Sequence, residues 1–403
     1  MLALTKQEKS RIQSVDFLRG LVIVIMALDH VRDFVTNVRF DPLDLDQSDP
    51  ALFLTRWITH FCAPVFIFLA GTSAGFQAQA GKRGKELSMF LLTRGIWLIF
   101  LELTVIKMAW MFNLTFFVGY HFLQVIWAIG ISMIALAGLV WLPKRAIAAI
   151  GIVMVAGHHL LAPIDAAVMA GLTQGGPFPA ATSFSDAIWL ILHMPGGIPI
   201  GPTVAFTAYP VIPWIGVMAL GYVFADIYMR EDSERRSLLM KLGVGAIILF
   251  LVVRGVNMYG DPTPWAMQDS IVKTILSFLN VTKYPPSLLF LLMTLGPALV
   301  ILSVSERWQG KAFDVFVTFG RVPLFFYVIH LYAAHLAAVA LATAQGQGPG
   351  MAMTFFVFYP PGYGVGLLGV YAFWIAIVVA LYFPSRWFAG VKKRSKAWWV
   401  SYF

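Results

Sequence analysis

Charged residues and cysteine are both scarce in this chain. Only 12% of its 403 residues are charged, whereas 59% are hydrophobic and the mean hydropathy is +0.77. No water-soluble domain of this length has a core large enough to bury so much apolar surface. The single cysteine, Cys62, excludes an intramolecular disulfide and a cysteine-based metal cluster. Composition therefore indicates a protein that uses the bilayer as its solvent.

The sequence also lacks the signatures of several common functional sites. It contains no glycine-rich phosphate loop followed by Lys and Ser or Thr, no G-x-S-x-G motif and no H-E-x-x-H zinc helix. No repeat of 20 to 50 residues is visible, nor two halves with matching broken helices of the kind found in many transporters. We therefore predict no metal site.

Long apolar runs recur along the whole chain, and each can cross about 30 Å of hydrocarbon as a helix. We predict an all-α, polytopic integral membrane bundle forming a single domain over residues 1–403, with no soluble domain. Two apolar stretches, 183–194 and 265–279, are too short to cross and better suit re-entrant or interfacial helices. The ten expected spans are residues 17–35, 57–74, 94–111, 122–142, 146–161, 211–228, 238–256, 286–303, 313–335 and 367–383.

The distribution of basic residues predicts the orientation. With ten spans, 22 of the 29 Lys and Arg residues lie on the side of both termini and 7 on the other side. The positive-inside rule then places both termini in the cytoplasm of a multi-pass protein of the cell (inner) membrane. The basic excess reflects this topology, so we expect membrane lipids and no nucleic acid as partners. The longer loops lie outside, where a large polar substrate would be met.

The first span carries a dense polar string that includes His30. Ionisable groups inside a membrane helix are costly unless they are paired or face a cavity. Asp33 shares a helical face with His30 and can orient its ring as a base, whereas Asp29 can reach Arg32. The alternative interpretation of the string is an ion-pair network at the membrane interface.

Arg19 lies eleven residues before His30, on nearly the same helical face and about 16 Å away along the axis. This spacing suits an extended donor with anionic phosphates near the cytoplasm and a reactive group near the outer leaflet. In the alternative interpretation, Asp16 and Arg19 simply pair with each other at the helix end.

Two further spans contain candidate residues. Glu102 lies about midway along the third span, where a charge needs a partner such as Arg321 or must stay protonated. Its role can be structural pairing, a proton path or contact with a donor. Tyr327 and His330 share a face of the ninth span and can either line a cavity with His30 or belong to an aromatic belt.

Four segments resemble the heparan-α-glucosaminide N-acetyltransferase catalytic-domain family, which is related to the acyltransferase-3 branch. A first-helix signature covers residues 11–35, and the likeness runs through most of the chain. The segments are 11–20 (RIQSVDFLRG), 29–33 (DHVRD), 63–73 (APVFIFLAGTS) and 320–330 (GRVPLFFYVIH).

The resemblance implies a transmembrane acyltransferase that takes an acetyl or other acyl group from cytoplasmic acyl-CoA and delivers it to a sugar or glycan across the membrane. Arg19 matches the family's first-helix arginine, and His30 matches the essential histidine of the acyltransferase-3 branch. The heparan-type enzymes have Asn at that position and a proposed catalytic His in the first outer loop, but residues 31–59 contain no His here. The base is then His30, or is supplied by His60, His330 or His335.

Our first hypothesis is therefore an acyl-CoA-dependent acyltransferase with His30 as general base, supported by Asp33, and with Arg19 and Arg321 on the donor phosphates. A homo-oligomer is compatible with this hypothesis. The alternative is a proton-coupled transporter or flippase of a small solute or lipid-linked glycan, in which Glu102 and the histidines near the outer side carry the protons. A third hypothesis is a binding or sensing protein that keeps the scaffold without turnover.

Overall fold

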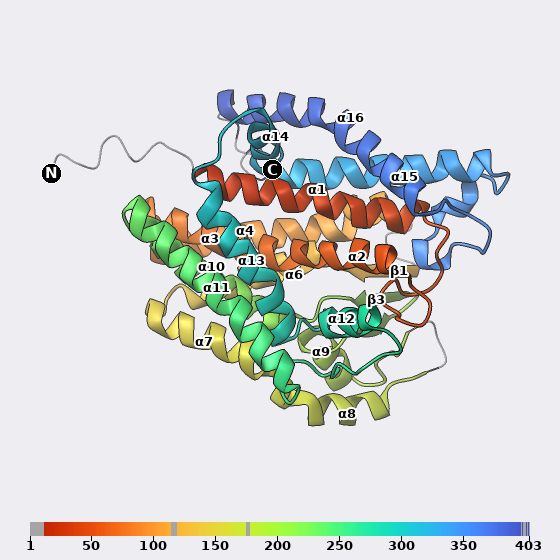
Figure 1. Ribbon diagram of the computed structural model, residues 1–403, viewed down its shortest axis with the longest axis horizontal. Coiled ribbons are helices and arrows are strands. Elements are labelled where there is room, and N and C mark those ends of the chain that lie inside the picture. Colours follow the sequence, from red (N-terminus) through yellow and green to blue (C-terminus); the bar gives the residue numbers. More distant parts are fainter. Residues whose placement is uncertain are drawn as a thin grey trace.

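We describe the protein from a computed structural model, which covers residues 12–113, 119–174, 178–395, 397, 400 and 402. Arg11 of the first-helix signature, and Lys6, Lys9 and Lys396 of the orientation count, lie outside the described residues. The described chain is mostly helical (Figure 1). Its helices are α1 (Gln13–Val35), α2 (Pro50–Ile58), α3 (Cys62–Gln79), α4 (Gly84–Leu101), α5 (Lys107–Met111), α6 (Val125–Leu139), α7 (Lys144–Gly157), α8 (Ala162–Gly171), α9 (Phe184–Leu192), α10 (Val211–Phe224), α11 (Asp232–Val256), α12 (Ile271–Leu279), α13 (Leu288–Ser305), α14 (Lys311–Arg321), α15 (Pro323–Ala344) and α16 (Leu367–Arg394).

Eight helical segments of the described chain are long and apolar enough to cross a membrane, which confirms a polytopic helical protein. They correspond to eight of the ten expected spans. The first expected span is α1, whose 23 residues extend about 35 Å but carry several charges. The fourth is α6, whose 15 residues reach only about 22 Å, less than the hydrocarbon thickness. The short apolar stretches form α9 and α12, of nine residues each.

The ninth expected span is not one helix. Residues 313–335 are divided between α14, which ends at Arg321, and α15, which begins at Pro323. Val322 between them has a non-helical backbone, with φ −132° and ψ 48°. The proline explains the break, because a residue preceding proline avoids the helical region and a proline suits the first turn of a new helix.

The prediction of an all-α fold was incomplete, because three short strands form a small sheet. The strand order is β1-β3-β2, with β1 parallel and β2 antiparallel to β3. The sheet, α9 and α12 lie toward one end of the long helices, and the start of α1 and the end of α16 lie toward the other (Figure 1). The strands are β1 (Gly119–Leu123), β2 (Gly196–Ile200) and β3 (Thr203–Thr207).

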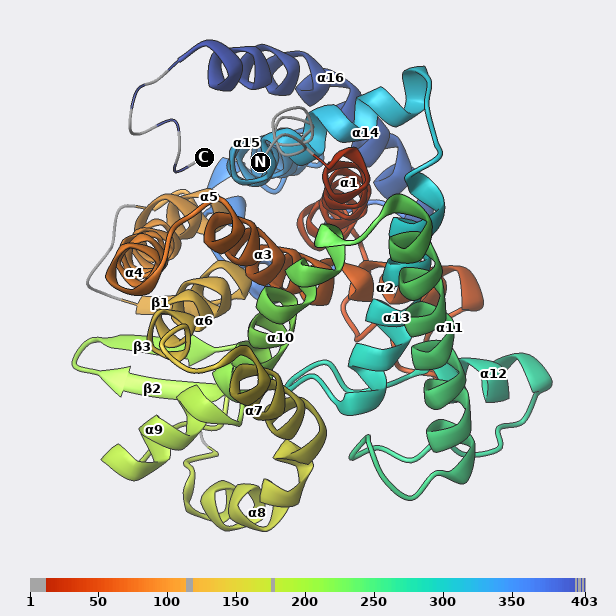
Figure 2. The ribbon, with the colours of Figure 1, turned by 90° about the vertical axis from the view of Figure 1, so that its left-hand side faces the viewer.

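The charged helix α1 lies inside the bundle. It packs against α3, α13, α14, α15 and α16, and most of its residues are buried (Figure 2). A helix surrounded by protein can keep ionisable side chains, because neighbouring helices supply partners that lipid does not. The position of α1 therefore explains why a helix of membrane-spanning length carries so many charges.

Glycines face each other where the principal helices cross. A Cβ added to either glycine of these pairs would meet backbone of the opposite helix, so the small residues allow the close approach typical of membrane bundles. The pairs are Gly20 with Gly320, Gly71 with Gly221, Gly95 with Gly130, Gly151 with Gly216, and Gly243 with Gly296.

Candidate functional site

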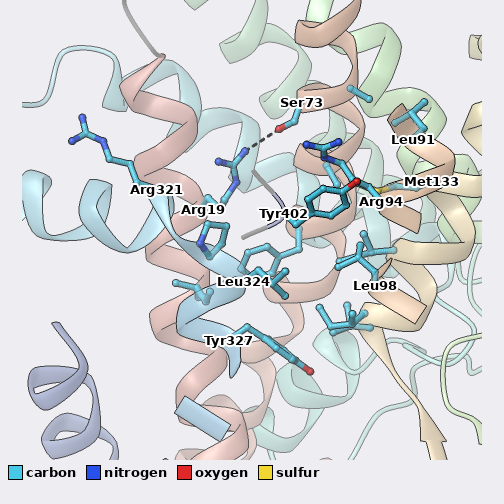
Figure 3. Close-up of a pocket in the computed structure, with 18 of the residues that line it drawn as sticks. Arg19, Ser73, Leu91, Arg94, Leu98, Met133, Arg321, Leu324, Tyr327 and Tyr402 are labelled. Atoms are coloured by element: carbon cyan, nitrogen blue, oxygen red, sulfur yellow. Dashed lines mark hydrogen bonds between the residues drawn. The ribbon is translucent and has the colours of Figure 1, made fainter. Parts of the chain in front are cut away.

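A cavity of about 330 Å³ lies between α1, α3, α4, α6 and α15, within the size range of small-molecule sites. Every charged side chain that lines it in the described chain is basic: Arg19, Arg94, Arg321 and Lys392. Figure 3 shows three of these residues at one end of the cavity, with Tyr327 at the other. All four basic residues belong to the group that the sequence places on the side of the termini. The cavity thus combines a cationic end with apolar walls.

Arg19 is held at the cationic end by three neighbours. Its guanidinium donates to Oδ1 of Asp16 (3.2 Å), to Oγ of Ser73 (3.1 Å) and to the carbonyl oxygen of Gly320 (3.3 Å). Nε of Arg321 lies 4.0 Å from Oδ2 of the same Asp16. Arg19 thus pairs with Asp16, as the alternative interpretation predicted, and it also lines the cavity.

Two basic residues at this end, Arg94 and Lys392, were missed by the sequence reasoning. The Arg94 guanidinium lies 3.7 Å from the ring centre of Phe90 and 4.8 Å from that of Tyr402, and Nζ of Lys392 donates to the carbonyl oxygen of Arg321 at 3.2 Å. The sequence offered only one indication of them, which is that both belong to the excess of basic residues on the side of the two termini. Nothing in their spacing connects α4 with the C-terminal segment.

The remaining wall of the cavity is apolar and ends at Tyr327. The ring of Tyr327 stands edge-on to the rings of His30 and His330, with centroid distances of 5.8 and 5.6 Å. The inner end of the cavity therefore lies next to the histidine pair. Its apolar walls include Phe66, Ala70, Leu91, Leu98, Ile129 and Met133.

His30 and His330 form a hydrogen-bonded pair. Nδ1 of His30 lies 2.7 Å from Nε2 of His330, and Nδ1 of His330 lies 2.8 Å from the carbonyl oxygen of Phe326. A carbonyl only accepts, so in the neutral pair His330 carries its proton on Nδ1 and accepts at Nε2, and His30 donates from Nδ1. This leaves Nε2 of His30 as an unprotonated base. No residue in the described chain hydrogen-bonds to that nitrogen.

The expected pairing of Asp33 with His30 is wrong. Nη2 of Arg32 binds Oδ1 of Asp33 at 2.7 Å and Oδ1 of Asp29 at 2.8 Å, and Arg56 from α2 binds the other oxygen of Asp29 at 2.6 Å. The predicted contact of Asp29 with Arg32 is confirmed. The carboxylates thus belong to an ion-pair network, and His330 takes the orienting position that the sequence reasoning gave to Asp33.

The other two candidate histidines, His60 and His335, lie outside the cavity lining, as His30 and His330 do, but neither contacts Tyr327 in the way that His30 and His330 do. His60 is fully buried against Phe290, and neither ring nitrogen has a partner within the described ranges. Nδ1 of His335 lies 2.6 Å from the carbonyl oxygen of Ala109, and its ring stacks on Phe112 with centroids 3.7 Å apart. His335 is therefore fixed in a packing role, and the geometry favours His30 as the base.

Glu102 has a different partner from the expected cation. Its Oε2 accepts a hydrogen bond from the backbone N–H of Trp127 at 3.0 Å, in the first turn of α6. No ion pair to Arg321 or Lys107 is present among the described residues, and Lys107 contacts His121 instead, at 3.0 Å. A carboxylate at a helix N-terminus satisfies backbone donors and the helix dipole. The geometry thus gives Glu102 a capping position.

This position predicts different outcomes for two substitutions. Glu102→Gln keeps an acceptor oxygen for the Trp127 N–H and is expected to leave the melting temperature and acetyl transfer near those of the wild type. Glu102→Ala leaves buried donors unpaired and is expected to lower the free energy of unfolding by about 1–3 kcal/mol. Thermal unfolding of the purified protein in detergent measures both. Loss of proton-coupled uptake in Glu102→Gln would instead favour the transport hypothesis.

Comparison with known families identifies a family that covers more than half of the chain. The family model described as heparan-alpha-glucosaminide N-acetyltransferase, catalytic, matches residues 11–259. The matched range includes α1 with Arg19 and His30, and the walls contributed by α3, α4 and α6. No curated protein matches the chain significantly.

Proposed function

The chain belongs to the heparan-alpha-glucosaminide N-acetyltransferase catalytic family, and from that membership we propose an acetyltransferase that works across the membrane in which it is embedded. It takes the acyl group from acyl-CoA on the cytoplasmic side and delivers it to a sugar or glycan on the extracytoplasmic side of the cell membrane. The observation that carries this proposal is the cavity that runs from four basic residues to the edge of the His30–His330 pair.

The lining residues fit an acyl-CoA donor. Arg19, Arg94, Arg321 and Lys392 would hold its phosphates. The guanidinium groups can bind phosphate oxygens through several donors at once, and the Lys392 ammonium adds a positive charge. The apolar walls suit its pantetheine arm, and Tyr327 marks the end at which the reactive group would lie. Bound acyl-CoA supplies an activated thioester carbonyl there.

His30 then acts on the acceptor. Its unprotonated Nε2 takes the proton from the acceptor amine or hydroxyl as that group attacks the carbonyl carbon, and afterwards returns a proton to the leaving sulfur. His330 holds the ring in the required tautomer through the 2.7 Å bond to Nδ1. Direct transfer and a route through an acylated His30 both use this geometry, and burst kinetics distinguish them.

The first test is donor binding. Arg19→Ala is expected to weaken acetyl-CoA binding by more than tenfold, since charge-assisted hydrogen bonds to phosphate contribute about 1.5–3 kcal/mol each. Isothermal titration of purified protein in detergent measures the dissociation constant. Arg230→Ala is the control, because Arg230 is exposed and does not line the cavity. The buried Arg254 would be unsuitable, since its loss would also change stability.

Transfer is tested with radiolabelled acetyl-CoA in proteoliposomes and a panel of amino sugars and glycans. Labelling of a sugar by the wild type is the expected result. A folded wild-type protein that binds no acetyl-CoA would overturn the proposal and make transport assays the next step. Intact donor binding without labelling of any acceptor would favour the non-catalytic hypothesis.

A further inference from the structure

The hydroxyl group of Tyr327 is an unusual feature of the cavity. The residue is only 3% exposed and lines the cavity, yet its Oη forms no hydrogen bond in the part of the chain that the structure describes. Tyr332, five residues later on the same helix, donates its hydroxyl proton to the carbonyl oxygen of Val105 at 3.0 Å. The two tyrosines thus differ in the hydrogen bonding of their hydroxyl groups, because the hydroxyl of Tyr332 has a partner and that of Tyr327 has none within the described chain.

An unpaired buried hydroxyl costs about 1–3 kcal/mol, which a bound acceptor atom would recover. The wall around Tyr327 is apolar, and the basic residues lie at the opposite end of the cavity (Figure 3). An anionic group would therefore be drawn to the far end, away from this hydroxyl. The partner that fits Oη is a neutral oxygen at the inner end of an elongated ligand, such as a carbonyl.

Tyr327 also lies beside the proposed base. Its ring contacts both His30 and His330, and α1 rises about 16 Å between Arg19 and His30. A donor with its phosphates at Arg19 and its arm extended along the cavity brings a thioester carbonyl to this place. A carbonyl at this place meets the unpaired hydroxyl, and its oxygen gains negative charge when the carbonyl carbon is attacked.

We infer that Tyr327 is a catalytic residue that donates a hydrogen bond from Oη to the thioester carbonyl oxygen and stabilises the negative charge that forms on it. The inference rests on the proposed function. In the step, the acceptor nitrogen or oxygen bonds to the carbonyl carbon, His30 takes its proton, and the carbonyl electron pair moves onto the oxygen held by Tyr327. When that pair returns, the carbon–sulfur bond breaks and the thiolate takes the proton from His30.

The test is Tyr327→Phe, which removes one hydroxyl and keeps the ring between the cavity and the histidines. Loss of an oxyanion donor is expected to lower kcat by about 10²–10³-fold with little change in acetyl-CoA affinity. Isotope-edited infrared spectroscopy of acetyl-CoA labelled with ¹³C at the carbonyl provides a direct readout. The bound carbonyl stretch is expected at lower frequency in the wild type than in Tyr327→Phe.

Tyr332→Phe is the matched control, because it loses a hydroxyl on the same helix without touching the cavity. It is expected to retain the wild-type kcat and carbonyl frequency. Equal carbonyl frequencies in the wild type and Tyr327→Phe, or an unchanged kcat, would overturn the inference while the proposed function stands. If the folded wild type binds no acetyl-CoA, the proposed function itself has failed.

Discussion

Replacing His30 by alanine is expected to reduce acetyl transfer by about 10²–10⁴-fold, the usual contribution of a positioned general base. Acetyl-CoA affinity is expected to stay near the wild-type value, because His30 does not line the cavity in which the donor is proposed to bind. Single-turnover kinetics with purified protein and an excess of acceptor measure the chemical step, and titration measures the affinity.

The pH dependence separates a base from a packing residue. Nε2 of His30 acts only when unprotonated, so the wild-type kcat/KM is expected to fall toward low pH, and this acid limb should disappear from the residual activity of His30→Ala. His330→Gln, which can still offer an acceptor to Nδ1 of His30, is expected to retain more activity than His330→Ala.

His159→Ala is the matched control for these variants. Nε2 of His159 accepts from the backbone N–H of Leu288 at 3.4 Å, and the residue does not line the cavity. It is expected to keep the wild-type rate. Transfer by His30→Ala at the wild-type rate, with the acid limb retained, would assign the base to another group, and His60 would be the next residue to replace.

Local patterns predicted the parts of this structure that depend on neighbours in the sequence. Apolar run length gave the helices that can cross a membrane, and helical periodicity gave the contact of Asp29 with Arg32 and that of Asp16 with Arg19. These contacts join residues three apart on one helix, so their geometry is a property of the helix itself. The same periodicity put Arg19 on the helical face of His30, and the structure places Arg19, but not His30, in the lining of the cavity.

The pairs that decide the chemistry are not local. The partner of His30 is His330, 300 residues away on α15. The N-terminus of α6 is capped by Glu102, which is separated from that helix in the sequence by strand β1. The convergence of Arg94 and Lys392 on one cavity depends equally on how α4, α6 and α16 pack. Asp33 was predicted as the partner of His30 because it is near in the sequence. Asp33 instead forms an ion pair with Arg32, whose positive charge makes it a stronger partner than a neutral histidine.

The second large effect is expected at the crossing of α1 and α14. A Cβ added to Gly20 would lie 1.8 Å from the carbonyl oxygen of Phe316, and one added to Gly320 would lie 1.8 Å from that of Asp16. The obstructing atoms belong to backbone, so no rotation of a side chain can relieve either contact. Gly20→Ala and Gly320→Ala must therefore push the two helices apart.

This crossing also places two of the proposed phosphate ligands. Arg19 precedes Gly20 and donates to the carbonyl oxygen of Gly320, and Arg321 follows Gly320. Separation of the helices is expected to destabilise the protein by about 3 kcal/mol, the upper end of usual overpacking costs. It should also weaken acetyl-CoA binding, although neither glycine lines the cavity. Thermal unfolding and titration in detergent measure the two effects.

Gly245→Ala on α11 is the matched control, because a Cβ at that position would meet no atom within 4 Å. It is expected to leave both the melting temperature and the affinity unchanged. A Gly20→Ala protein with wild-type stability and affinity would contradict the close approach of α1 and α14. A stable Gly20→Ala protein with weakened binding would mean that the helices adjust at the expense of the arginines, which still ties donor binding to this crossing.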